Sequence, residues 1–155
     1  MTIVKVRLVR ALVFSVALYG CEAWTLNKDL QGRVNAFEFW CWRRLLHVSW
    51  RDKRTNVYIW EEIGGGTSLE IKALKMKLSY FGHVVRSEGL EKTVMLGMGG
   101  GSRGRGRPRR RWMDEICEVT NLNLSRLMIV AREIDGWREL VKVVTRDRNR
   151  PDGTR

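Results

Sequence analysis

A run of arginines in the second half of the chain carries the clearest chemical signal in the sequence. Between Gly101 and Arg111 there are six arginines and no acidic residue. Guanidinium groups stay charged at physiological pH, and the glycines between the first three oppose helix formation. Such an extended cationic string is a poor catalyst, but it binds closely spaced phosphates because each guanidinium neutralises one phosphate and releases a counterion. The predicted nucleic-acid contacts in this run are Arg103, Arg105, Arg107, Arg109, Arg110 and Arg111.

The centre of the run, Gly104–Arg109, also has the pattern of a hook for the minor groove of DNA. In such a hook, extended arginines enter the narrow groove of A·T-rich DNA and a proline directs the chain. The alternative is a solvated linker whose charge only keeps it extended. The sequence favours contact with nucleic acid over the linker, and it leaves selective insertion into the groove open.

A second basic and aromatic group lies within five positions, at Trp40, Trp42, Arg43 and Arg44. The two tryptophans do not both fit the apolar face of one helix, so we expect one of them at the surface. An indole ring beside guanidinium groups can stack on a base while the cations hold phosphate. Trp42, Arg43 and Arg44 are therefore candidate nucleic-acid contacts. Burial of both tryptophans against neighbouring helices is the alternative.

Patterns typical of an enzyme are missing from the sequence. Two-metal phosphoryl transfer requires converging carboxylates, whereas Glu61–Glu62 and Asp114–Glu115 fall on expected helices, where neighbouring side chains point about 100° apart. Exposed helix faces explain both pairs. Only His47 and His83 could act as general bases, and there is no Gly-x-Ser-x-Gly, Gly-Lys-Ser/Thr or His-Glu-x-x-His motif. We predict no catalytic residue.

The cysteines Cys21, Cys41 and Cys117 form an odd and widely spaced set. This spacing is not a disulfide framework and indicates a reducing compartment. A zinc site would combine them with His47 from distant segments, whereas structural zinc ligands usually come in close pairs. We therefore predict no metal and no other cofactor.

The composition agrees with a nucleic-acid partner. Lys and Arg total 29 against 17 Asp and Glu, a formal net charge of +12 over 155 residues, and this sign favours polyanionic partners. The apolar run Ala11–Tyr19 has nine residues, well short of the roughly 20 that cross a bilayer, and no clear cleavage site follows it. We predict a buried helix there, no membrane partner, and a nuclear or cytoplasmic protein that is not secreted.

The chain is expected to be all-α, because it has two prolines and long stretches without glycine. In the first half of the chain, helices are expected over 4–19, over 28–47 with Asn27 as N-cap, and over a short stretch from Thr55 to Gly64. A fourth helix is expected to begin at a Thr67–Glu70 capping box. Three more are expected near the C-terminus: one that begins at Pro108, one near 124–131, and one that begins after Asp135.

Two of these helices carry further predictions. Phe37 and Leu45 lie on the periodic apolar face of the 28–47 helix and are expected in the core. Lys72 and Lys75 lie on the polar side of the helix that follows Thr67, and they are further candidate contacts with nucleic acid.

Four blocks of sequence, in this order, resemble the region beyond the polymerase palm in LINE-type, non-LTR retrotransposon endonuclease/reverse transcriptases. The resemblance covers the chain from about Val4 to Trp137. Four matching blocks in the right order are specific evidence of the family, whereas one block alone would be weak evidence. The blocks are Leu8–Leu26, Ala36–Leu46, Tyr80–Arg86, and Gly104–Pro108 with Trp112–Ile116.

The resemblance implies the thumb and post-thumb region of such a protein. It implies a thumb-like helical bundle, which we expect over 1–97, and a C-terminal helical segment, which we expect over 112–145. The glycine-rich composition predicts an Arg/Gly-rich linker over 98–111, and the polar residues after 145 predict a disordered tail over 146–155. In this family the polymerase uses adjacent aspartates and a separate endonuclease lies upstream, whereas no two aspartates are adjacent here.

The function expected from the resemblance is therefore non-catalytic binding of a primer–template or of the element RNA. Two alternatives remain open at this point. The chain could be the translated remnant of a dead element with no function, or a host-adopted DNA-binding protein that uses the Arg-Gly-Arg-Pro hook. The oligomeric state does not follow from the sequence.

Overall fold

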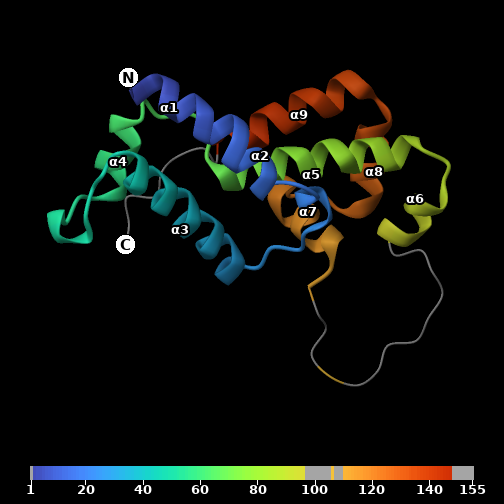
Figure 1. Ribbon diagram of the computed structural model, residues 1–155. Coiled ribbons are helices and arrows are strands. Elements are labelled where there is room, and N and C mark those ends of the chain that lie inside the picture. The colour runs from blue at the N-terminus through green and yellow to red at the C-terminus, as the bar shows by residue number, and fades with distance from the viewer. Residues whose placement is uncertain (1, 97–105, 107–109, 148–155) are drawn as a thin grey trace.

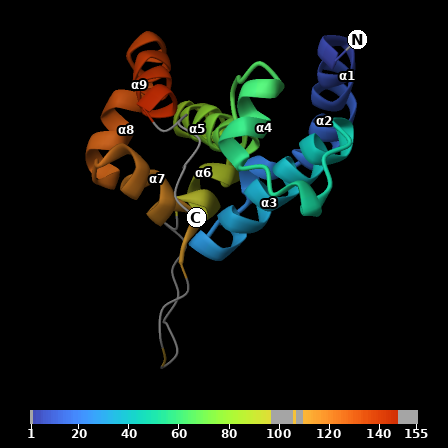
Figure 2. The ribbon, with the colours of Figure 1, turned by 90° about the vertical axis from the view of Figure 1, so that its left-hand side faces the viewer.

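The computed structural model describes residues 2–96, 106 and 110–147, and within these ranges the chain is all-helical, as predicted, without a strand (Figures 1 and 2). A π-helical segment, Val9–Val13, joins the first two helices, and 3-10 turns cover Cys21–Ala23 and Trp50–Asp52. The α-helices are α1 (Thr2–Leu8), α2 (Phe14–Ala17), α3 (Lys28–Leu45), α4 (Asn56–Glu62), α5 (Leu69–Arg86), α6 (Leu90–Met95), α7 (Trp112–Thr120), α8 (Leu124–Arg132) and α9 (Ile134–Asp147).

The first helical stretch exists as predicted, but the expectation that it is buried is wrong. The π-helical segment has wider turns than an α-helix, and it brings Val6, Phe14 and Leu18 to one buried face. The opposite face is apolar as well and lies open to solvent, with Val16 76% and Tyr19 88% exposed. Within the described ranges, no helix is long and apolar enough to span a membrane.

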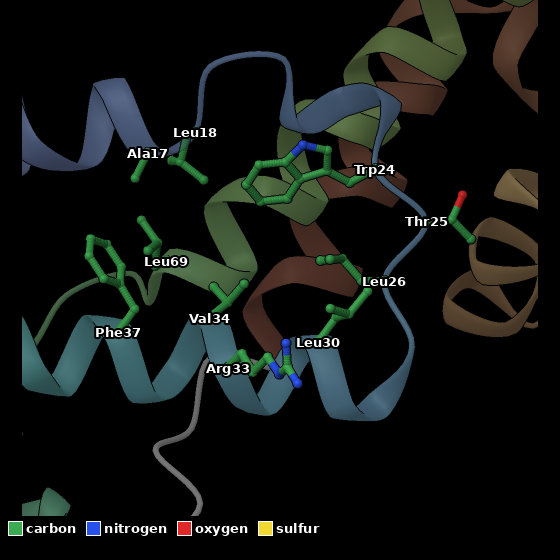
Figure 3. A pocket seen from close by; sticks show the side chains of 10 residues that line it. All are labelled: Ala17, Leu18, Trp24, Thr25, Leu26, Leu30, Arg33, Val34, Phe37 and Leu69. Atoms are coloured by element: carbon green, nitrogen blue, oxygen red, sulfur yellow. The ribbon is translucent and has the colours of Figure 1, made fainter.

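Helix α3 begins where predicted, because the Asn27 side chain accepts a hydrogen bond from the backbone N–H of Leu30 at 2.8 Å. Its buried face differs from the periodic one, since the buried residues are Glu38, Cys41 and Trp42. Phe37, expected in the core, is 37% exposed. It lines an apolar hollow of about 440 Å³ between α2 and α3, in which Arg33 is the one charged lining residue among those that the structure describes (Figure 3).

A buried carboxylate fixes this face of α3. Glu38, 1% exposed, accepts hydrogen bonds from the backbone N–H of Leu69 at 2.8 Å and from the indole N–H of Trp42 at 3.3 Å. Leu69 is the first residue of α5, so Glu38 satisfies a free amide at that N-terminus. Burial raises the pKa of Glu38, and the two hydrogen bonds oppose this rise.

Helix α5 crosses the middle of the molecule between two groups of helices (Figures 1 and 2). Its N-cap is Ser68, whose side chain accepts from the N–H of Ile71 at 3.3 Å. The predicted capping box from Thr67 is therefore wrong by one residue, because Glu70 instead accepts a hydrogen bond from Asn35 on α3 at 2.9 Å.

The helices after residue 111 pack directly on α5. Phe81 of α5 contacts the rings of Trp112 on α7 and Trp137 on α9, at centroid distances of 6.2 and 5.2 Å. At Gly82 a Cβ atom would lie 2.5 Å from the Trp137 ring, so this position requires glycine for the close approach of the two helices. The predicted segments 1–97 and 112–145 therefore share a core in the described part of the chain.

Two helix starts near the C-terminus differ from their predictions. Helix α7 begins at Trp112 and Arg110 is already outside it, so the helix does not start at Pro108, which itself lies outside the described residues. Helix α9 begins at Ile134, which places Asp135 inside the first turn instead of at the N-cap. It continues to Asp147, and the rest of the predicted tail lies outside the described residues.

Candidate nucleic-acid interface

Basic and aromatic side chains gather where α3 ends and the chain turns toward α4. We call this surface the basic–aromatic hollow; it encloses about 530 Å³, within the usual range of roughly 300–1,000 Å³ for small-ligand sites. Its lining residues are Trp40, Arg43, Arg44, Val48, Ser49, Trp50, Lys53 and Arg54.

Local backbone chemistry positions the second half of the hollow. The helix ends before His47, which takes a left-handed conformation with φ of 56°. Ser49 and Asp52 then form a capping box, in which the Asp52 carboxylate accepts from the N–H of Ser49 at 2.7 Å. Lys53 also takes a left-handed conformation, with φ of 46°, and ends the 3-10 turn before Thr55 caps α4. This turn fixes the backbone that carries Trp50 and Lys53.

The arginines of the hollow are held by contacts other than carboxylates. Arg43 donates hydrogen bonds to the carbonyl of Arg54 at 3.0 Å and to the side chain of Asn56 at 2.9 Å. The guanidinium of Arg44 lies 5.8 Å from the centre of the Trp40 ring, and that of Arg54 lies 4.7 Å from the centre of the Tyr58 ring. These cation–π contacts orient the side chains without neutralising them.

The hollow therefore carries uncompensated positive charge. Between Glu38 and Glu61 the only acidic residue is Asp52, and its carboxylate is occupied in the capping box. Among the described residues, each ion pair lies elsewhere, and none includes a residue of the hollow. Several fixed cations without acids next to exposed indole rings are suited to bind a polyanion that also has aromatic faces.

Of the residues predicted on α3, Arg43 and Arg44 line the hollow and Trp42 does not. Trp42 has no exposed surface and packs edge-on against Phe14 at 5.0 Å between ring centroids. The selection of Trp42 as a nucleic-acid contact is therefore wrong, because its side chain faces the core. The expectation that one tryptophan of the pair lies at the surface is confirmed by Trp40, which is 59% exposed.

The predicted lysines of α5 do not line the hollow. Lys75 is exposed. Lys72 is half-buried, with its ammonium 5.9 Å from the Phe14 ring, and burial together with nearby Arg10 lowers its pKa. Lys72 thus faces the core between α2 and α5, and its placement does not favour a phosphate contact.

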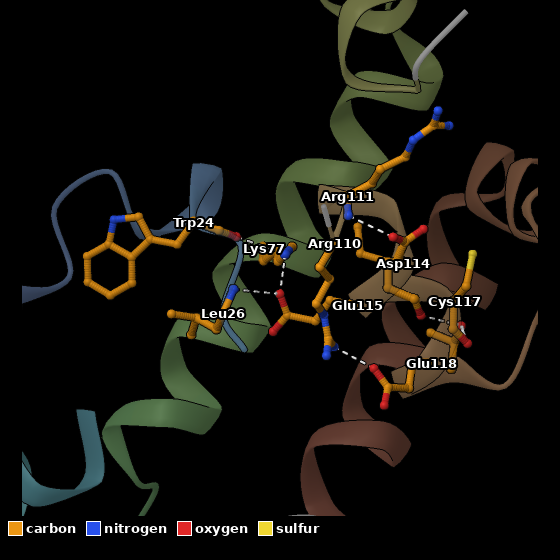
Figure 4. Close-up of polar contacts among 11 residues, drawn as sticks. Trp24, Leu26, Lys77, Arg110, Arg111, Asp114, Glu115, Cys117 and Glu118 are labelled. Atoms are coloured by element: carbon orange, nitrogen blue, oxygen red, sulfur yellow. Dashed lines mark hydrogen bonds and ion pairs between the residues drawn. The ribbon is translucent and has the colours of Figure 1, made fainter. Parts of the chain in front are cut away.

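The arginine-rich run lies mostly outside the described residues. Arg103, Arg105, Arg107 and Arg109 are not described, and their contacts with nucleic acid stay predictions. Arg110 forms an ion pair with Glu118 (Figure 4), so its guanidinium already has an acidic partner. Arg111 is exposed, and its backbone N–H donates to Asp114 at 2.7 Å.

Of the acids considered as metal ligands, Glu61 and Glu62 are exposed as expected, whereas Asp114 and Glu115 have structural roles. Asp114 accepts the N–H at the start of α7. Glu115, expected on an exposed helix face, is instead 3% exposed and paired with Lys77 of α5 (Figure 4). Within the described ranges, no three His, Cys, Asp or Glu side chains converge as metal ligands. Burial raises the pKa of each of the three free thiols, which makes them less reactive.

Sequence reasoning missed the second half of the hollow, from Trp50 to Arg54. The available signal was the segment Trp50-Arg-Asp-Lys-Arg54, which has three basic residues and one acid next to a tryptophan. The pattern Ser49-x-x-Asp52 around it indicates a capped turn, which would place this tryptophan near the surface.

No protein-family model, curated protein or solved structure matches this chain. The fold and the site, over the residues that the structure describes, define an all-α protein with a basic and aromatic surface at the end of α3.

Proposed function

We propose that this chain binds nucleic acid and has no catalytic role of its own. The observation that carries the proposal is the basic–aromatic hollow, in which cations without acidic partners lie beside two exposed tryptophans. A phosphate backbone satisfies such cations, and counterion release drives its binding. The undescribed arginines between Arg103 and Arg109 would add phosphate contacts.

The resemblance to the thumb region of LINE-type reverse transcriptases supports the same kind of partner. A thumb holds the primer–template behind a polymerase site, and this chain has no adjacent aspartates to form such a site. We therefore propose that it retains the binding part of such a protein. We place it in the nucleus or cytoplasm, where nucleic acid is present and free thiols stay reduced.

A charge-removal experiment tests the proposal. The double variant Arg44→Gln/Arg54→Gln removes two cations of the hollow, neither of which has an acidic partner among the described residues. We expect the slope of log K against log salt to become shallower by about 1.4 for a single strand and about 1.8 for duplex DNA, at roughly 0.7 and 0.9 per phosphate contact. Fluorescence anisotropy of a labelled oligonucleotide measures the slope.

The matched control is Arg138→Gln/Lys142→Gln on α9, which removes the same charge from side chains that are each 70% exposed and paired with acids. An equal change of slope in the control would mean that net charge alone drives binding, and would contradict the proposed site.

Two other outcomes would favour the alternatives. A protein that binds no nucleic acid at any salt would favour a remnant without function. A preference for A·T-rich duplex that Arg105→Gln/Arg107→Gln abolishes would favour the minor-groove hook.

A further inference from the structure

Two large aromatic rings of the basic–aromatic hollow are exposed to solvent. Trp40 is 59% exposed and Trp50 is 82% exposed, and both line the same hollow from different segments, α3 and the 3-10 turn after it. Tryptophan is highly buried on average. In this chain Trp42, Trp112 and Trp137 follow that rule and lie in the core. The two exposed rings therefore need a reason other than packing.

Each ring has the same kind of neighbour. Arg44 lies 5.8 Å from the centre of the Trp40 ring, and Arg51 lies 5.7 Å from that of Trp50. In each contact the arginine and the tryptophan are close together in the sequence. Neither arginine has a carboxylate partner within the described residues. The hollow thus presents two indole rings, each with a cation beside it.

This arrangement distinguishes paired from unpaired bases. In a duplex, both faces of a base are covered by its neighbours, so a protein ring cannot stack on it unless the base leaves the helix. An unpaired base offers a free face, and stacking on an aromatic side chain is strong and tolerant of sequence. Cations alone would bind the phosphates of both forms.

We infer that the basic–aromatic hollow binds unpaired nucleotides of a single strand, with bases stacked on Trp40 and Trp50 and phosphates held by the surrounding cations. This inference rests on the proposed function and narrows its ligand to single-stranded RNA or DNA, or to a single-stranded end beside a duplex. Arg43, Arg44, Lys53 and Arg54 line the same hollow and supply the cations.

The test compares one labelled oligonucleotide as a single strand and as a duplex. We expect the wild-type chain to bind the single strand more tightly, and Trp50→Ala and Trp40→Ala each to weaken single-strand binding by roughly tenfold while duplex binding changes little. Trp50→Phe keeps a stacking face and is expected to recover most of the loss. Tyr19→Ala is the matched control, because Tyr19 is an aromatic residue 88% exposed on another face and does not line the hollow.

The outcomes separate the inference from the proposed function. Equal affinity for both forms, with wild-type binding in Trp40→Ala and Trp50→Ala, would overturn the inference and leave a hollow that binds phosphate only. Absence of binding to every oligonucleotide at low salt would overturn both. Circular dichroism of each variant confirms that the fold is retained, and because both rings are largely exposed, we expect it to be.

Discussion

Replacing Lys77 by methionine is expected to destabilise the protein by about 3–5 kcal/mol. Lys77 is 3% exposed, forms an ion pair with the equally buried Glu115, and donates to the carbonyl of Trp24 at 2.9 Å (Figure 4). Its removal leaves the Glu115 carboxylate buried, with the backbone N–H of Leu26 as its remaining partner at 3.3 Å. The ion pair joins α5 to α7 and the hydrogen bond to Trp24 joins α5 to the segment before α3, so removal of Lys77 breaks both connections. Urea unfolding followed by circular dichroism measures the change.

Lys142→Met is the control for this prediction. Lys142 pairs with Glu139 on the exposed face of α9, where the two side chains are 70% and 68% exposed, and an exposed pair of this kind contributes less than about 1 kcal/mol. The double variant Lys77→Met/Glu115→Leu is expected to recover part of the loss, because it removes the unpaired charge. If Lys77→Met unfolds at the urea concentration of the wild type, the ion pair does not join these helices.

Truncating Trp42 to alanine is expected to cost about 3–5 kcal/mol, the usual range for a buried aromatic residue. Trp42 has no exposed surface, packs on Phe14 with ring centroids 5.0 Å apart, and donates to Glu38 at 3.3 Å. The truncation opens a cavity and also removes one hydrogen bond from a buried carboxylate. The free energy of unfolding from urea titration gives the cost, provided that the slope with denaturant is unchanged.

Trp40→Ala is the matched comparison on the same helix. Trp40 is 59% exposed, so we expect its truncation to change the free energy of unfolding by less than about 1 kcal/mol. The two variants should therefore separate cleanly, with Trp42 affecting stability and Trp40 affecting binding. Equal losses of stability would show that the assignment of core and surface on α3 is wrong.

Local chemistry allowed much of the fold to be predicted. The all-α class, the N-terminus of α3 at Asn27 and the end of the first helical stretch near Gly20 all follow from short-range patterns. Asn27 caps α3 as expected, and Gly20 takes the left-handed conformation, φ of 69°, that ends a helix. These features depend on neighbours within a few residues, which is the range over which a sequence pattern is informative.

The face that α3 presents to the core depends on distant residues. A hydrophobic period centred on Phe37 omits Glu38, yet Glu38 is buried because it caps α5, 31 residues further along the chain. On the same helix, Trp42 also faces the core, where it packs on Phe14, and Trp40 lies at the surface. Glu115 is a similar case, because its partner Lys77 lies 38 residues away. Pairings of charged groups at such separations have no local signature.

The prediction of Thr67 as the N-cap of α5 failed for a related reason. Both residues can cap a helix, and Glu70 completes a capping box only if its carboxylate is free. In the fold it accepts a hydrogen bond from Asn35 of α3 instead. By contrast, the turn that carries Trp50 has a readable capping pattern at Ser49 and Asp52, and this part of the candidate site could have been predicted.

Photo-cross-linking is the most direct test of the claim that nucleic acid binds at the basic–aromatic hollow. A single strand that contains 5-iodouracil forms adducts on irradiation with aromatic side chains stacked on its bases. After tryptic digestion, we expect adducts on peptides 34–43 and 45–51, and fragmentation should place them at Trp40 and Trp50 rather than at Trp42. A strand that binds the chain but gives adducts only on other peptides would contradict the account.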